Sequence, residues 1–222
     1  MRKISHYFAG FFVFCCLPVI GWSVFDLSGF LNNNYRLSFI IFMSLSMIFV
    51  VIFVPDEGSG SGEGKSTIKR QNLVIGYLKL ITPALLILSP FSDRHHVLVL
   101  PESENLRIIG LILCAVGYFF MNWSILALGR QFSLNVTLLE DHKLISRGPY
   151  RIIRHPRYLG IMMLYLGLSL LFLSQIALIL TFITFFVIIW RISDEEKLLQ
   201  QQFGNEWDEY KKRTYNFIPY LF

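Results

Sequence analysis

The sequence carries little charge over long stretches, and this shortage fixes its broad class. Only 16% of its 222 residues are charged, and Asp, Glu, Lys and Arg are all absent from four runs, 7–25, 37–54, 108–129 and 158–190. A fifth run, 71–91, contains Lys79 as its one charged residue. A helix needs roughly 20 apolar residues to cross the hydrocarbon core of a bilayer. An ordinary soluble domain is therefore excluded, and the sequence predicts an all-α integral membrane protein.

Cysteine is scarce as well, which excludes a cysteine-based metal site. Cys15, Cys16 and Cys114 lie inside apolar runs without ligand spacing, so we expect them to be packing residues. No module that stacks on bases or reads a groove is present, and a nucleic-acid partner is not expected. The net charge of +5 instead indicates contact with anionic lipid headgroups.

The last apolar run is too long for a single span. It covers residues 158–190, and Ser174-Gln175 near its middle suits a turn. We therefore expect a C-terminal helical hairpin and about six membrane helices in all. The N-terminal run is interpreted as a retained span, because no small-residue cleavage site follows it.

Lysine and arginine are concentrated in alternate loops. They are frequent before the first span, in 55–70, in 130–157 and in the tail, and sparse in the other loops. Under the positive-inside rule this predicts a multi-pass protein with both termini in the cytoplasm. The membrane would be the endoplasmic reticulum or a bacterial or archaeal inner membrane, according to the host. Nothing in the sequence indicates an oligomeric state.

The chain divides into two predicted parts. Residues 1–105 form N-terminal membrane helices with a polar linker at 55–70, and Pro83 is expected to kink one of them. Residues 106–222 form the catalytic core, with membrane helices, a polar loop at 130–157, the hairpin 158–190 and a tail helix at 193–214. The loop that holds Asp93, His95, His96, Glu102 and Glu104 is expected to be solvated, and no metal site is predicted.

Charged residues flank the last hairpin on both sides. Arg154-His155-Pro156-Arg157-Tyr158-Leu159-Gly160 precedes it, and Asp194-Glu195-Glu196 follows it. Pro156 suits the first turn of a helix, and a hairpin brings its open ends together. We therefore expect Glu195 or Glu196 to approach Arg154 and His155. Charges placed together at a membrane boundary are usually functional, and this pair of clusters could hold a zwitterionic small molecule.

Several motifs resemble the isoprenylcysteine carboxyl methyltransferase family, in order and at the family's spacing. They are Leu128–Ser133, Asp141–Tyr150, Arg154–Gly160 and the segment from Glu195-Glu196 through Phe203-Gly204-Asn205-Glu206-Trp207 and Tyr210 to Pro219. The resemblance covers roughly residues 110–222. It implies S-adenosylmethionine as methyl donor, S-adenosylhomocysteine as product, and a cofactor pocket on the cytoplasmic side.

The resemblance also implies the site residues. The residues that match the family's cofactor-binding motifs, and are therefore expected to bind the methyl donor, are His142, Leu144, Ile145, Tyr150, His155, Pro156, Tyr158, Glu195 and Glu196. Arg154 is the candidate for orienting the acceptor, and Glu195 and Tyr158 are the other catalytic candidates, because either could manage a proton.

The expected reaction is methyl transfer to a lipophilic acceptor that enters from the bilayer, above all the C-terminal carboxylate of an isoprenylcysteine. That carboxylate has a reference pKa of about 3.3–3.7 and needs no general base at neutral pH. A phospholipid N-methyltransferase and a small-thiol S-methyltransferase stay open as alternatives. An NADPH-dependent membrane reductase is disfavoured, because Ile161 follows Gly160 where those enzymes typically have Glu. A non-catalytic membrane protein is disfavoured by the charged motifs themselves.

Overall fold

The computed structural model describes residues 8–53, 69–129 and 144–217. These residues form helices and two isolated β-bridges, without a strand. The N-terminal elements are a π-helical turn η1 (Phe12–Cys16), α2 (Leu17–Trp22), α3 (Leu27–Leu31) and α4 (Asn34–Phe53). The others are α5 (Lys69–His95), α6 (Glu104–Leu128), the 3₁₀ turn η4 (Gly148–Arg151), α7 (Pro156–Leu171), α8 (Gln175–Phe203) and α9 (Asn205–Arg213).

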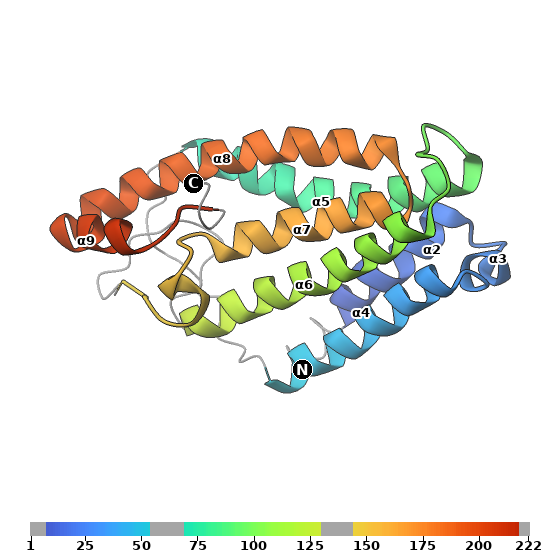
Figure 1. The fold of residues 1–222 in the computed structure, drawn as a ribbon, viewed down its shortest axis with the longest axis horizontal. Coiled ribbons are helices and arrows are strands. Elements are labelled where there is room, and N and C mark those ends of the chain that lie inside the picture. The colour runs from blue at the N-terminus through green and yellow to red at the C-terminus, as the bar shows by residue number, and fades with distance from the viewer. Residues whose placement is uncertain (1–7, 54–68, 130–143, 218–222) are drawn as a thin grey trace.

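The long helices run side by side along one axis (Figure 1). α5, α6 and α8 are long and apolar enough to cross a membrane, and three shorter apolar helices cover Phe8–Trp22, Asn34–Val50 and Pro156–Leu171. η4 and α9 lie at one end of the bundle, and α3 lies at the other end with the loop between α5 and α6 (Figure 1).

The predicted division of the last apolar run is confirmed. α7 ends at Leu171, and Ser174 caps α8 by accepting a hydrogen bond from the Ala177 N–H at 3.1 Å. Leu173 takes a positive φ of 49° in the turn. The hairpin therefore places the start of α7 and the end of α8 at the same end of the molecule, as the predicted site requires.

The predicted start of a tail helix at residue 193 is wrong. α8 continues without a break to Phe203, and the helix boundary lies at Gly204, whose φ is +52°. Residues 191–193 contain no glycine or proline, so nothing in the chain stops the helix there. Pro83, where a kink is predicted, and Pro90 both lie inside α5.

Glycines allow α6 and α7 to pack backbone against backbone. A Cβ atom built on Gly117 would lie 2.6 Å from the Gly160 carbonyl oxygen, and one built on Gly167 would lie 2.6 Å from the Cys114 nitrogen. Small residues at such spacing let membrane helices approach closely. This contact fixes α7, which carries the Arg-His-Pro-Arg-Tyr motif at its start, against α6.

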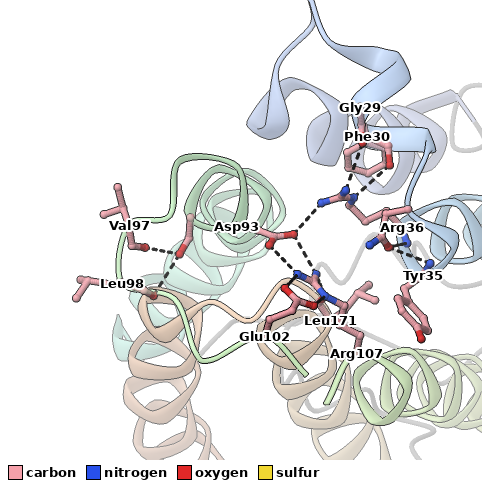
Figure 2. Close-up of polar contacts among 12 residues, drawn as sticks. Gly29, Phe30, Tyr35, Arg36, Asp93, Val97, Leu98, Glu102, Arg107 and Leu171 are labelled. Carbon is pink, nitrogen blue, oxygen red and sulfur yellow. Dashed lines mark hydrogen bonds and ion pairs between the residues drawn. The ribbon is translucent and has the colours of Figure 1, made fainter. Parts of the chain in front are cut away.

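A buried ion-pair network joins the helix ends opposite the predicted site (Figure 2). Asp93 lies 2.9 Å from Arg36 and 2.9 Å from Arg107, and Arg107 also donates to Glu102 at 2.8 Å and to the Leu171 carbonyl at 2.9 Å. Arg36 and Arg107 are buried, as is Asp93. The prediction that Asp93 lies in a solvated loop is therefore wrong. Its buried carboxylate pairs with both arginines and so connects α5 to α4 and α6.

Replacing Asp93 with leucine should destabilise the fold strongly. Removing one partner of a buried ion pair costs about 3–5 kcal/mol, because the remaining charge stays buried without compensation. Here two guanidinium groups would be left facing each other. Thermal unfolding in detergent measures the effect, and Glu102→Gln is the matched control, because the Glu102 side chain is 71% exposed. Equal melting temperatures for the two variants would contradict a structural role for Asp93.

Candidate functional site at the open end of the α7–α8 hairpin

The start of α7 is held in place by the C-terminal segment. The Arg154 N–H donates to the Tyr215 carbonyl at 2.8 Å, and the Tyr215 N–H donates to the Ile152 carbonyl at 2.8 Å. The His155 N–H donates to the Asn216 carbonyl at 3.2 Å. The backbone of the motif is thus fixed by pairing across some sixty residues of sequence, so the geometry of Arg154 and His155 depends on the tail.

Glu196 joins α8 to this motif. Its Oε1 atom accepts a hydrogen bond from Arg154 Nε at 2.7 Å and lies 3.3 Å from His155 Nε2. Arg154 Nη1 also donates to the Thr214 carbonyl at 2.6 Å. The approach of a glutamate to both Arg154 and His155, predicted from the hairpin, is confirmed in these contacts. Oε1 is the carboxylate oxygen that Glu196 uses in these contacts with described residues.

Glu195 has a different partner one position earlier on α8. Its Oε2 atom accepts a hydrogen bond from the Tyr158 hydroxyl at 2.9 Å, and Arg191 Nε in turn donates to the Tyr158 oxygen. Arg191 and Glu195 are four residues apart, which places them on one face of α8. The Tyr158 hydroxyl is therefore held between a cation and an anion.

Tyr150 lies beside the same cluster. Burial, followed by the charge of Glu195, raises the pKa of its phenol far above the ordinary value, so the phenol stays neutral. Its carbonyl accepts a hydrogen bond from the Tyr210 hydroxyl at 2.7 Å, which ties η4 to α9. Pro156 opens α7 as predicted, and Leu144 and Ile145 lie half-buried in the segment before η4. His142 is outside the described residues.

A cavity of about 330 Å³ lies between the membrane helices and reaches Tyr158. Most of its lining side chains are apolar and come from η1, α5, α6 and α7. The polar exceptions include Tyr158, Arg157, Arg191 and Lys79. The cavity therefore joins an apolar interior to the hydroxyl that contacts Glu195.

A second hollow borders Glu196. This open groove of about 450 Å³ runs between α8 and α9 and is lined by Glu196, Gln200, Trp207, Lys211 and three neighbours. The indole Nε1 of Trp207 is buried and has no hydrogen-bond partner within the described part of the chain. Glu196 thus borders a polar groove, and its neighbour Glu195 contacts the Tyr158 hydroxyl, which lines the apolar cavity.

Two contributors to this site were missed by the sequence reasoning. The sequence analysis assigns Arg191 no role, although its spacing of four residues from Glu195 is a usable signal. The backbone of Thr214–Asn216 carried no such signal, because its carbonyls act through pairing that only the fold creates.

Comparisons with known proteins agree with these features. The model of the phospholipid methyltransferase family matches residues 106–206. A probable protein-S-isoprenylcysteine O-methyltransferase of Oryza sativa subsp. indica is 27% identical over 157 residues, which cover 64% of this chain and 79% of the relative. Protein-S-isoprenylcysteine O-methyltransferase B of Arabidopsis thaliana is 25% identical over 205 residues, which cover 89% and 98% of the two chains.

A solved structure shares the fold. The structure of a eukaryotic intramembrane Ras methyltransferase, isoprenylcysteine carboxyl methyltransferase, aligns with a TM-score of 0.56 and 20% identity over 93% of this chain and 73% of that one. The motifs, the relatives and the fold point the same way: this chain is similar to the isoprenylcysteine carboxyl methyltransferases in sequence and in helical fold.

Proposed function

We propose that this protein transfers a methyl group from S-adenosylmethionine to the C-terminal carboxylate of an isoprenylcysteine. One observation carries the proposal: Tyr158 lines the cavity between the helices, and the Tyr158 hydroxyl donates to Glu195 at 2.9 Å. An apolar site for a lipid tail and a carboxylate pair suited to a polar cofactor therefore meet at one side chain.

The donor set fits S-adenosylmethionine. Glu195 and Glu196 each use one carboxylate oxygen in the contacts described, and the second oxygen of each can accept from an ammonium group or from ribose hydroxyls. The groove beside Glu196 offers room of about 450 Å³ and the buried Trp207 N–H. When bound, the cofactor supplies a methyl group on a sulfonium, which is transferred by in-line displacement.

The residues assigned to the donor are His142, Leu144, Ile145, Tyr150, His155, Pro156, Tyr158, Glu195 and Glu196, on the cytoplasmic side of the membrane. His155 is buried and Tyr158 is buried, so both can exclude water from the transfer. Arg154 takes a different role from the one its sequence position suggested. Its contacts with Glu196 and with the Thr214 carbonyl make it a positioning residue for the donor side.

The acceptor carboxylate would lie at the inner end of the cavity, next to Arg191 and Arg157. A guanidinium there can hold one carboxylate oxygen and leave the other directed at the methyl group. The acceptor is already ionised at neutral pH, so the chain has only to align it and keep water out. The prenyl tail would occupy the apolar part of the cavity, which Phe14 and Leu78 help to line.

Binding measurements test the donor assignment. Calorimetric titration of the purified protein with S-adenosylhomocysteine should give a saturable heat, and titration with NADPH should give none. Heat with NADPH alone would favour a membrane reductase and contradict the proposal.

Replacing Arg191 with methionine should separate the acceptor from the donor. The loss of a charge-assisted contact costs about 1.5–3 kcal/mol, so we expect the ratio kcat/KM for the acceptor to fall about 10- to 100-fold. Affinity for S-adenosylhomocysteine should fall less than kcat/KM does, because Arg191 reaches the donor side through the Tyr158 hydroxyl. Arg154→Met is the matched control and should weaken S-adenosylhomocysteine binding instead. If Arg154→Met instead lowered kcat/KM for the acceptor and Arg191→Met weakened S-adenosylhomocysteine binding, Arg154 would be the residue that orients the acceptor.

A phospholipid N-methyltransferase is the second candidate, and the family model matched at residues 106–206 favours it. An amine acceptor must lose a proton, and Glu195, held against Tyr158, is the group placed to take it. The cavity weighs against this candidate, because its lining contains three cationic residues and no Asp or Glu among the described residues.

A further inference from the structure

We propose that Lys79 selects the acceptor at the lipid-facing mouth of the cavity. Its ammonium group would attract an amphiphile with an anionic headgroup as it enters from the bilayer, and would disfavour the neutral methyl ester that the reaction produces. The inference rests on the proposed function, because it concerns the acceptor cavity of the same site.

Lys79 is charged at a depth where charge is rare. It is the one charged residue in 71–91, and it lies ten residues along α5 from Lys69, or about 15 Å at the helical rise. It falls within the candidate membrane span Leu73–His95. Ionisable residues inside membrane helices usually face a partner or a pathway rather than hydrocarbon alone, so Lys79 calls for such a role.

The helical spacing places Lys79 on the cavity. α5 lines the cavity with Ile75, Leu78, Lys79, Thr82 and Pro83. These positions follow the spacing of one helix face, and the lysine is its single charged member. Leu80, the next residue, is 72% exposed and does not line the cavity. A lysine whose ammonium group only extends to the membrane surface could lie on any lipid-facing side of the helix, whereas Lys79 lies on the side that lines the cavity.

Exposure places Lys79 at the outer end of the cavity. Its side chain is exposed, whereas Arg191 is 7% exposed and Arg157 is half-buried. Because the exposed surface of a membrane helix meets lipid, the Lys79 end of the cavity opens toward the bilayer. An entering headgroup would therefore meet Lys79 first and the two arginines afterwards.

The charges of the lining favour the substrate over the product. All three charged lining residues, Lys79, Arg157 and Arg191, are cationic. Methylation converts an anionic carboxylate into a neutral ester, so the attraction that draws the substrate in is absent for the product. Electrostatic complementarity of this kind acts on encounter and on selectivity more than on the chemical step.

Steady-state kinetics of the full-length protein in detergent micelles tests the proposal. The acceptor is N-acetyl-S-farnesylcysteine, and its methyl ester is added as a competing ligand. We expect Lys79→Met and Lys79→Gln to raise KM for the acid about threefold to fivefold, at the upper end of the range for an exposed charge pair, and to leave kcat within about twofold. The preference for the acid over the ester, taken as the inhibition constant of the ester divided by KM of the acid, should fall by the same factor.

Lys79→Arg should restore both quantities, and Leu80→Met should change neither. A structural role for Lys79 would alter melting temperature or kcat without changing the preference for acid over ester. The proposal would be overturned if Lys79→Met and Lys79→Gln kept wild-type activity, with KM for the acid and the preference for acid over ester both unchanged. A wild-type protein that methylates no carboxylate acceptor would contradict the proposed function itself, and the role of Lys79 would fall with it.

Discussion

Replacing Gly117 with valine should abolish the folded state, and Gly117→Ala should already lower the free energy of unfolding by about 3 kcal/mol, at the upper end of overpacking costs. A Cβ atom on Gly117 would lie 2.6 Å from the Gly160 carbonyl oxygen and 2.6 Å from the Leu164 nitrogen. Both neighbours are backbone atoms, so no side chain can move aside, and α6 and α7 would have to separate. Thermal unfolding and size-exclusion chromatography in detergent measure the effect.

Gly76 provides the matched control for this prediction. It also lies inside a long helix, but a Cβ atom built on it would meet nothing within 4 Å. Alanine is the better helix former by about 0.5–1 kcal/mol, so Gly76→Ala should be neutral or stabilising. A Gly117→Ala variant as stable as Gly76→Ala would contradict the close packing of α6 on α7.

Replacing Glu196 with glutamine should weaken S-adenosylhomocysteine binding about 10- to 100-fold and reduce methyl transfer at least as much. Oε1 of Glu196 accepts from Arg154 at 2.7 Å and lies 3.3 Å from His155. Hydrogen bonds to a charged group contribute about 1.5–3 kcal/mol each, and the variant loses the charge that organises both partners. Calorimetry with S-adenosylhomocysteine gives the affinity directly.

The control for Glu196 is Glu209→Gln on α9, whose side chain is 63% exposed and pairs with Lys212 alone in the contacts described. That variant should bind S-adenosylhomocysteine like the wild type. Should Glu196→Gln lower the melting temperature and leave the affinity unchanged, Glu196 would be a structural residue and the donor site would lie elsewhere.

The parts of this site that the sequence predicted correctly depend on local signals. Ser174-Gln175 interrupts an apolar run that is too long for one span, and Pro156 suits the first turn of a helix. Together these two features bring Glu196 to Arg154 and His155, which the structure confirms. The start of the tail helix was wrong, because a change from apolar to charged residues does not end a helix, whereas Gly204 does.

The parts that escaped prediction depend on contacts between distant segments. Asp93 follows an apolar run and is acidic, so it was expected in a solvated loop. Its burial follows from two arginines that approach from α4 and α6, and no local pattern shows that convergence. The cavity is a similar case, because η1, α5 and α7 each contribute only a few apolar side chains to it.

The central claim is that this protein forms a carboxyl methyl ester on a prenylated cysteine, and one labelling experiment tests it most directly. Purified protein is supplied with S-adenosylmethionine labelled on the methyl group and with N-acetyl-S-farnesylcysteine or phosphatidylethanolamine vesicles. We predict label in the farnesylcysteine that is released as methanol by mild base, and at least about tenfold less of it with the Glu196→Gln variant at matched protein. Base-stable label in the phospholipid, with none in the farnesylcysteine, would contradict the account.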